Sequence, residues 1–293
     1  MFEVERSIRV LDGAVVIFDA VAGVQAQSET VWGQARRNSI PGIAYLNKMD
    51  REGASFENTV AMIANKLSVV PVPVQIPLFE NGRFEGVVDL LTMESLHWGD
   101  HNGTHLIRKS IYDGRRGSED PNRRRAERAR EEMTEIIADG DEQVMDAFLK
   151  TSELPPELLR GGLRRMALAS KCVPILCGSS FRNKGVQPLL DAVVDYLPSP
   201  LDRPPAIAVD VKGNKREVHP RSSTHQGEDP FCALAFKVVH HHQKGHLVYF
   251  RVYSGTATPG MTLHNSTLDT KVCFVTPLSY YRVFFFFFFF FCW

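Results

Sequence analysis

The chain has 293 residues, 44% of them hydrophobic, which is enough for one large core or for one core with a smaller satellite domain. Its 34 basic and 34 acidic residues balance, so no overall electrostatic field attracts nucleic acid or a membrane surface. Five cysteines at irregular spacings argue against a disulfide framework and a zinc site, and favour small buried side chains in a reducing compartment.

The two ends of the chain carry no membrane signal. The first residues, MFEVERSIRV, are charged and lack the apolar segment of a signal peptide, and they make a poor organelle transit peptide. The phenylalanine run at 284–291 is much shorter than the roughly 20 residues that a membrane helix needs. We expect no membrane partner and no DNA partner.

The main body of the chain alternates between short apolar runs and amphipathic segments. Apolar runs without polar interruption are typical of strands that are buried on both faces of a parallel sheet. The alternation therefore predicts an α/β fold with a doubly wound parallel sheet. In chain order we expect the end of a helix at 3–12, a strand at 14–20, a helix at 27–37, a strand at 42–48, a helix at 56–67, a strand at 173–179 and a helix at 186–196.

Two other regions have a different pattern. An inserted α+β subdomain is expected at about 77–165, with a small sheet, a hairpin turn at Asn81-Gly82 and a charged helical stretch at 120–150. After the α/β domain, 1–200, we expect a proline-rich linker at 201–229. Alternating strands at 230–265 indicate the start of an antiparallel β-barrel, and 266–293 form an aberrant tail.

The segment NKMD, from Asn47 to Asp50, follows the second predicted strand of the sheet. Ligands of open α/β sheets bind at the carboxyl ends of the strands. The carboxylate of Asp50 can accept hydrogen bonds from the N1–H and the 2-amino group of guanine, and adenine lacks this donor pair. Lys48 can lie along the base, and Asn47 can tie the loop to its neighbours. A solvated loop is the alternative interpretation of these four residues taken alone.

A second candidate loop follows the third predicted strand. The backbone N–H groups around Ser179, Ser180 and Phe181 are placed to meet the guanine O6 if this loop lies beside the NKMD loop. These three residues complete the predicted nucleotide-binding set with Asn47, Lys48 and Asp50.

With these motifs in view, the chain resembles the elongation factor G branch of the translational GTPases. The resemblance lies in residues 3–32, in NKMDREGASF at 47–56 and in 178–200. ALAFKVV and FRVYSGT, from 233 and 250, resemble the opening of that family's second domain, a β-barrel. Within the branch, VVDLLTMESLHW from 87 and the short link into the barrel look most like the mitochondrial ribosome-releasing type.

The resemblance implies a partial GTPase domain of the P-loop type, with GTP or GDP as cofactor and Mg²⁺ in the intact family member. It implies the mitochondrial ribosome, with its RNA and proteins, and the ribosome recycling factor as partners in splitting spent ribosomes. The implied location is the mitochondrial matrix. A fragment of a translocating elongation factor G is the alternative within the family, and a nonfunctional gene-model product is the alternative outside it.

The chain departs from the family pattern in three motifs. The phosphate loop G-x-x-x-x-G-K-[ST], the first switch with its Mg²⁺-binding threonine, and D-T-P-G-H do not occur. We therefore assign no catalytic residue and no metal ligand, and we expect no GTP hydrolysis by this chain, because that reaction depends on positioning phosphates, metal and water. Resemblance also ends after Asn265. We expect both ends to be artefacts of a gene model or of an alternative transcript, and we expect poor solubility from an open sheet edge at 14–20.

Two clusters of basic or metal-ligating residues are given a structural interpretation. His240, His241 and His242 are consecutive, so on a strand they cannot converge on one ion, and a polar turn is expected. Arginines interleave with glutamates along the predicted charged helix, which favours a solvated helix over a contact with ribosomal RNA. These arginines are Arg123, Arg124, Arg125, Arg128 and Arg130.

Overall fold

The computed structural model describes residues 2–80, 82–100, 102–113, 120–151, 154–209, 213–218, 230–243, 245–273 and 289–290. The chain divides into two compact units. We call Gly13–Leu197 together with Phe287–Trp293 the sheet unit, and Met1–Asp12 together with Pro198–Phe286 the hairpin unit. Each unit is described by itself.

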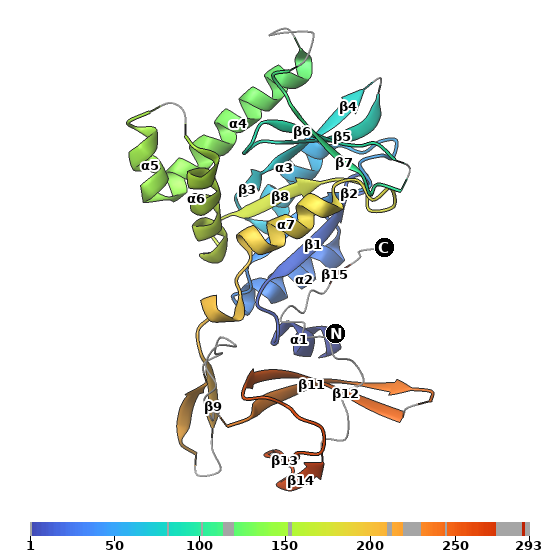
Figure 1. Cartoon of the computed structure of the whole chain (residues 1–293), viewed down its shortest axis with the longest axis vertical. Helices are drawn as coiled ribbons and strands as arrows, with labels where there is room; N and C mark the ends of the chain where they lie inside the picture. The colour runs from blue at the N-terminus through green and yellow to red at the C-terminus, as the bar shows by residue number, and fades with distance from the viewer. Residues whose placement is uncertain are drawn as a thin grey trace. The chain divides into compact units, whose positions relative to one another are not determined.

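A parallel sheet of five strands forms the centre of the sheet unit (Figure 1). Its strand order is β15-β1-β2-β8-β3, and every neighbouring pair is parallel. The three strands predicted from apolar runs lie together in the middle, because their side chains are buried on both faces. The strands are β1 (Ala14–Asp19), β2 (Gly42–Asn47), β3 (Pro71–Pro73), β8 (Val173–Cys177) and β15 (Phe289–Phe290).

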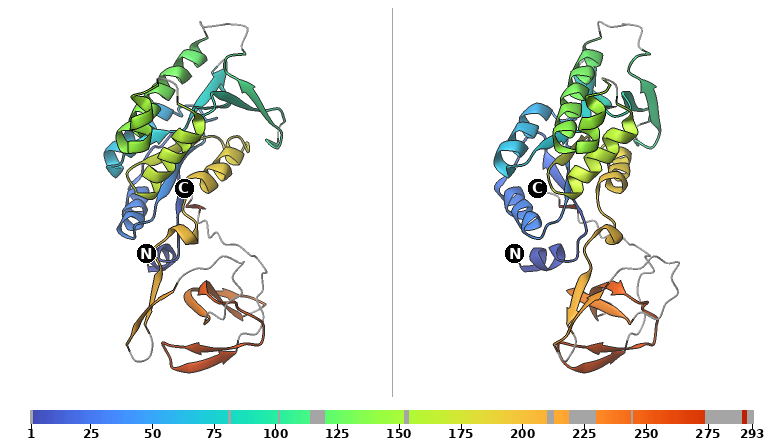
Figure 2. Two further views of the ribbon diagram at one scale, coloured as in Figure 1. Left: turned by 60° about the vertical axis from the view of Figure 1, so that its left-hand side comes forward. Right: turned by 90° about the vertical axis from the view of Figure 1, so that its left-hand side faces the viewer.

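Helices cover both faces of this sheet, which confirms the predicted doubly wound α/β fold. α2 (Ala26–Arg37) and α3 (Phe56–Leu67) lie together on one face, and α6 (Pro156–Leu168) and α7 (Val186–Tyr196) lie on the other (Figures 1 and 2). The Ser55 hydroxyl accepts a hydrogen bond from the Asn58 N–H and so caps the start of α3.

Two details of the sheet differ from expectation. β3 was not predicted, because PVP carries two prolines and proline is a poor strand former. The edge of β1 was expected to be open, but Phe289 and Phe290 pair in parallel with Val15 and Val16. This pairing covers two of the six residues of β1.

The predicted insertion is a four-stranded antiparallel sheet followed by helices. The sheet has the order β4-β5-β6-β7. Glu80 pairs with Arg83 across the expected hairpin turn; Gly82 has a positive φ there, and Asn81 lies outside the described residues. The elements are β4 (Gln75–Glu80), β5 (Arg83–Asp89), β6 (Glu94–Trp98), β7 (Leu106–Ser110), α4 (Pro121–Gly140) and α5 (Glu142–Phe148), and α6 completes the insertion.

Among its described residues, the hairpin unit contains a short α-helix, one 3-10 helix and three antiparallel strand pairs. The pair β9–β10 lies inside the segment predicted as a linker, and β14 follows the predicted barrel segment that ended at 265. The elements are α1 (Phe2–Ile8), η2 (Pro200–Asp202), β9 (Ala206–Val209), β10 (Lys215–Val218), β11 (Cys232–His241), β12 (Gly245–Ser254), β13 (Thr262–Asn265) and β14 (Thr270–Cys273).

One arginine connects the N-terminal segment of the hairpin unit to β12. Nη1 of Arg251 donates to the carbonyl oxygen of Val10 at 2.5 Å, and Nη2 donates to both carboxylate oxygens of Asp12 at 2.8 Å. The guanidinium also lies over the ring of Tyr253. Such planar, two-pronged pairing is specific to arginine.

The cysteines of the described residues carry no disulfide. Cys172 and Cys177 are buried, and burial raises the pKa of the Cys172 thiol to about 12 and also raises the pKa of Cys177. Cys232 is half-buried and Cys273 is exposed, so the expected burial holds for two of these four. Among the helices that the structure describes, none is both long and apolar enough to cross a membrane.

Candidate functional site

The loops that follow β2 and β8 meet at the carboxyl edge of the parallel sheet. Asn47, the last residue of β2, is buried, and its Oδ1 accepts hydrogen bonds from the Lys48 N–H at 2.8 Å and from the Ser180 N–H at 2.9 Å. The Met49 N–H donates to the carbonyl oxygen of Gly178 at 3.1 Å. The structure therefore brings the NKMD loop and the Ser179–Phe181 loop together, as a nucleotide site at this edge requires.

Lys48 is held by a carboxylate from the neighbouring strand. Its backbone has a φ of 66°, which is unusual for a residue other than glycine, and its Nζ lies 2.5 Å from Oδ2 of Asp19. Burial alone would raise the pKa of Asp19, but hydrogen bonds from Lys48 and from the N–H groups of Val21 and Ala22 outweigh it and lower this pKa. The ammonium of Lys48 is thereby fixed beside the carboxyl end of β1.

Asp50, the residue expected to read the guanine edge, lies near the second loop. Its Oδ2 is 3.7 Å from Nε of Arg182, and both side chains keep solvent contact. An exposed ion pair of this length contributes little stability. The carboxylate is therefore accessible to a competing donor pair such as the one guanine presents.

The backbone donors of the second loop are not equally available. The Ser179 N–H already donates to the carbonyl oxygen of Lys184 at 2.9 Å, and the Ser180 N–H donates to Asn47. Among the described residues, the Phe181 N–H has no partner, and the Phe181 side chain is 93% exposed. Of the three predicted N–H groups, only that of Phe181 is free to meet the guanine O6 without breaking an existing bond.

Two glycines shape this second loop. A Cβ on Gly178 would lie 2.3 Å from both the Lys184 carbonyl oxygen and Oη of Tyr45, so no larger residue fits. Gly185 has a φ of 86° and directly precedes α7, a backbone conformation that glycine adopts readily. The loop conformation is therefore fixed by close backbone packing.

The inserted sheet supports the same loop from outside. Trp98 Nε1 donates to Oε1 of Gln187 at 3.1 Å, and Nε2 of Gln187 donates to the Gly103 carbonyl oxygen at 2.7 Å. Nδ2 of Asn183 donates to the carbonyl oxygens of Asn102 and Gly103 at 3.1 Å. The turn between β6 and β7 therefore holds the loop that carries Phe181.

Asp19 and Arg182 belong to the candidate site, although no sequence motif pointed to them. Asp19 ends β1 and is the register partner of Asn47, which ends β2. Parallel strands bring their carboxyl ends to one edge. The polar residue at the end of the first predicted strand could therefore have been assigned to the same site from the sequence. Arg182 follows Phe181 directly, but nothing in the sequence indicated that it would lie near Asp50.

The loop residues described above are assigned to the base of a guanine nucleotide and not to its metal. Among the described residues, no group of three or more His, Cys, Asp or Glu side chains is arranged to hold a metal ion. No residue of this chain is assigned to the Mg²⁺ that the family resemblance implies, and no chemical step is assigned to that ion.

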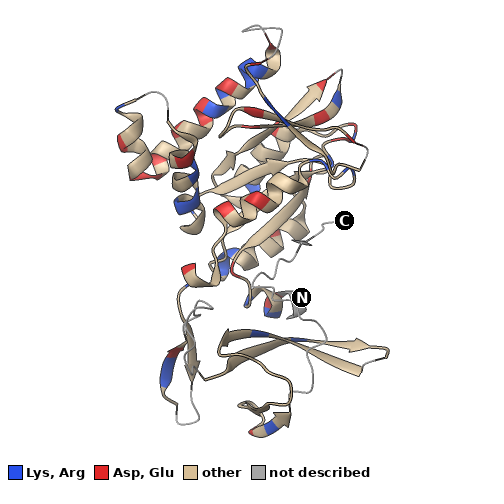
Figure 3. Ribbon diagram, in the orientation of Figure 1, with Lys and Arg blue, Asp and Glu red and all other residues tan. Residues whose placement is uncertain are grey.

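The two basic clusters form ordinary structural contacts. His240 pairs with His246 across β11 and β12, and His241 stacks on His242, so the histidines lie at the end of a hairpin. Basic and acidic residues interleave along α4 (Figure 3). Arg123 pairs with Glu127 of the same helix, whereas Arg125 and Arg130 contact other elements. Arg125 pairs with Glu57 of α3 and the Pro77 carbonyl of β4, and Arg130 donates to the carbonyls of Leu90, Leu91 and Leu154.

Comparisons with known proteins identify the family of this chain. The family model of the Elongation factor Tu GTP binding domain matches residues 1–199. The chain is 46% identical over 265 residues to "Elongation factor G" of Petrotoga mobilis, covering 90% of this chain and 37% of the relative. It is also 46% identical over 268 residues to "Elongation factor G" of Thermotoga maritima, with the same two shares. The chain thus spans little more than a third of the length of these relatives.

One solved structure supports the fold. A crystal structure of a protein from Thermus thermophilus superimposes with a TM-score of 0.72 at 24% identity, covering 92% of this chain and 36% of that one. At this identity the likeness concerns the fold alone.

Proposed function

We propose that this chain binds a guanine nucleotide through its base. The chain belongs to the family of the Elongation factor Tu GTP binding domain. The observation that carries the proposal is the pair of hydrogen bonds to Oδ1 of Asn47, which hold the NKMD loop and the loop after β8 at one sheet edge. In this arrangement Asp50 accepts from the N1–H and 2-amino group of the base, Lys48 lies along it, and the Phe181 N–H meets its O6. Binding displaces Arg182 from Asp50.

The contacts to the base alone set the expected affinity. They supply on the order of −4 kcal/mol, which corresponds to a dissociation constant near ~1 mM. Discrimination against adenine is expected to be stronger than this weak affinity suggests, because an unmatched base leaves the Asp50 carboxylate without its donors. No release of phosphate is expected, since the sequence contains no G-x-x-x-x-G-K-[ST] segment.

A calorimetric titration of the purified chain with GDP and, separately, with ADP tests the proposal. We expect GDP to bind and ADP not to bind over the same concentration range. Asp50→Asn should abolish detectable GDP binding, while Glu52→Gln, an exposed acidic position two residues along, should leave it unchanged. Equal binding of the two nucleotides, or unchanged GDP binding by Asp50→Asn, would contradict guanine recognition by this loop.

We propose further that this chain is a fragment of a GTP-hydrolysing translation factor that acts on the mitochondrial ribosome, in the matrix, and splits its subunits together with the ribosome recycling factor. The support is the sequence resemblance of VVDLLTMESLHW from 87 and of the link into β11, and the relatives named elongation factor G. Light scattering of mitochondrial ribosomes with the recycling factor, with and without the full-length factor that contains this chain, measures splitting. Stimulation of messenger translocation without splitting would favour the translocating alternative.

A further inference from the structure

A second site lies in the sheet unit, and it is independent of the proposed guanine site. A cavity of about 330 Å³ lies between the inserted antiparallel sheet, α6 and α7. Its apolar wall includes Leu91, Leu96 and Ala192, and its polar wall includes Gln75 and Asp89. This volume is at the lower end of the range of small-molecule sites.

Gln75 and Asp89 are direct partners across β4 and β5, so their side chains stand on the same face of that sheet. Gln75 is 2% exposed, and its Oε1 has no hydrogen-bond partner in the described part of the chain. A buried acceptor of this kind calls for a donor that the protein does not supply.

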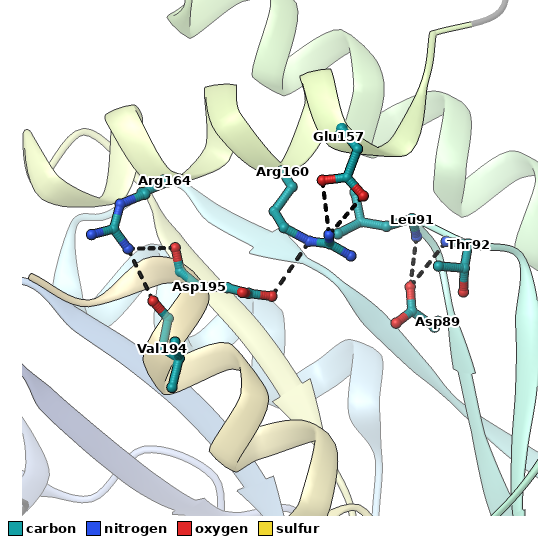
Figure 4. A network of polar contacts seen from close by, with 8 residues as sticks. All are labelled: Asp89, Leu91, Thr92, Glu157, Arg160, Arg164, Val194 and Asp195. Atoms are coloured by element: carbon teal, nitrogen blue, oxygen red, sulfur yellow. Dashed lines mark hydrogen bonds and ion pairs between the residues drawn. The ribbon is translucent and has the colours of Figure 1, made fainter.

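Asp89 presents a second free acceptor. Its Oδ1 accepts hydrogen bonds from the N–H groups of Leu91 and Thr92 at 2.8 and 3.2 Å (Figure 4). No hydrogen bond or ion pair to Oδ2 is found within the described ranges. Burial raises the pKa of Asp89, although those two N–H groups and the more distant Arg160 and Arg108 oppose the rise. A cation beside Oδ2 would favour the charged carboxylate and so oppose the effect of burial on Asp89.

The arginines of the cavity already have acidic partners. Nη1 of Arg160 donates to both carboxylate oxygens of Glu157 at 2.9 and 3.0 Å, and its Nε lies 3.4 Å from Asp195 (Figure 4). Arg108 pairs with Glu94 at 3.5 Å. Asp89 and the exposed Asp191 are therefore the lining carboxylates without an ion pair among the described residues.

We propose that this cavity binds a small organic cation, a primary ammonium on a short aliphatic chain, with the ammonium between Gln75 and Asp89. An ammonium has three N–H donors and no acceptor, which suits two unpartnered oxygens on one sheet face. Its aliphatic chain packs against Leu91, Leu96 and Ala192. The carboxylate of Asp191 at the surface attracts the positive charge toward the cavity.

The probe for this site is n-butylammonium chloride, and 1-butanol is the neutral control of similar size. Saturation-transfer NMR with the full chain should show butylammonium binding with a dissociation constant of about 1–10 mM, as its few heavy atoms allow, and no binding of butanol. Binding of neither probe would mean that the cavity holds only water, and equal binding of both would mean that the charge is irrelevant. Either result would overturn the proposal.

Three variants locate the binding. Gln75→Met removes the free acceptor at similar volume, and Asp89→Asn removes the charge while keeping an oxygen for the Leu91 and Thr92 N–H groups. Each should weaken butylammonium binding about tenfold, a factor set by losing one charge-assisted contact. Asp146→Asn removes one charge at an exposed position of α5 and should change nothing. Circular dichroism checks folding; if Asp89→Asn does not fold, an unchanged affinity of Gln75→Met is sufficient to reject the site.

Discussion

The sheet unit buries the apolar residues of its central strands, whereas the hairpin unit leaves several of its apolar strand residues exposed. All residues of β2 and β8 are buried, whereas β11 and β12 leave Leu234, Val238 and Val248 largely exposed. Both pairs of strands are rich in the residues that favour β-structure. The difference arises because the parallel strands are covered by helices on both faces, while each described strand of the hairpin unit pairs with one neighbour only.

This difference in burial leads us to expect a difference in stability. A two-stranded hairpin is marginal in water unless one face packs against another layer. In the hairpin unit the Arg251 contact with Val10 and Asp12 buries polar groups. We therefore expect core substitutions to matter most in the sheet unit and polar contacts to matter most in the hairpin unit.

The largest expected effect comes from paired truncations, one in each unit. Leu46→Ala removes a side chain that is 0% exposed in β2 and should lower the free energy of unfolding by about 3 kcal/mol. Leu234→Ala, at a β11 position that is 45% exposed, should change it by less than about 0.5 kcal/mol. Urea unfolding followed by far-UV circular dichroism measures both. Equal losses of unfolding free energy in the two variants would contradict this expectation, because they would mean that β11 buries this face in solution.

A second pair of variants tests polar contacts inside the sheet unit. Arg130 donates to the carbonyl oxygens of Leu90, Leu91 and Leu154. Arg130→Ala leaves these acceptors without their charged donor and should cost about 2 kcal/mol of unfolding free energy. Arg128→Ala, an exposed neighbour on α4, is the matched control and should cost less than about 0.5 kcal/mol. A smaller loss for Arg130→Ala than for Arg128→Ala would show that the carbonyls find water instead.

The corresponding test in the hairpin unit uses Arg251. The side chains of Arg251 and Asp12 are 16% and 17% exposed, so losing one partner should lower the free energy of local opening by about 1–2 kcal/mol. Arg251→Ala should accelerate tryptic cleavage after Arg9, measured by mass spectrometry. Arg251→Lys keeps the charge without the planar fork and should give an intermediate rate. Unchanged cleavage in both variants would mean that this contact does not hold the N-terminal segment.

The smallest expected effect is a pH dependence within the sheet unit. Arg165 donates to both carboxylate oxygens of Asp141 at 2.7 and 2.8 Å, and these hydrogen bonds lower the pKa of Asp141 against the opposing effect of burial. A lowered pKa stabilises the fold above the ordinary aspartate pKa of about 3.9, and this stability is lost as pH falls through the lower value.

Asp141→Asn keeps the cap on the Val144 N–H and removes only the charge. It should therefore cost about 0.5–1 kcal/mol at neutral pH, and this difference from the parent chain should shrink toward zero below about pH 4. Urea midpoints measured at several pH values give the result. A difference that stays constant with pH would show that the charge of Asp141 is not the cause.

Much of the sheet unit and part of the site could be predicted from local patterns. The runs at β1, β2 and β8 are uniformly apolar, and a strand buried on both faces requires this. Asn47 ends β2 and Asp50 follows it, so both were expected at the carboxyl edge of the sheet, where ligands of open α/β sheets bind. These inferences needed only the period of hydrophobicity and the order of elements along the chain.

The remaining features depend on contacts between residues far apart in the sequence. Pairing with β8 makes PVP a strand, although its prolines oppose that assignment. Asn47 and Lys184 occupy the N–H groups of Ser180 and Ser179, which leaves Phe181 as the free donor. The cavity beside Gln75 and Asp89 forms only when β4, β5, α6 and α7 pack together. A sequence determines which side chains seek burial or a partner, but the tertiary structure decides which partner each one receives, because hydrogen bonds and packing act only across the short distances that folding creates.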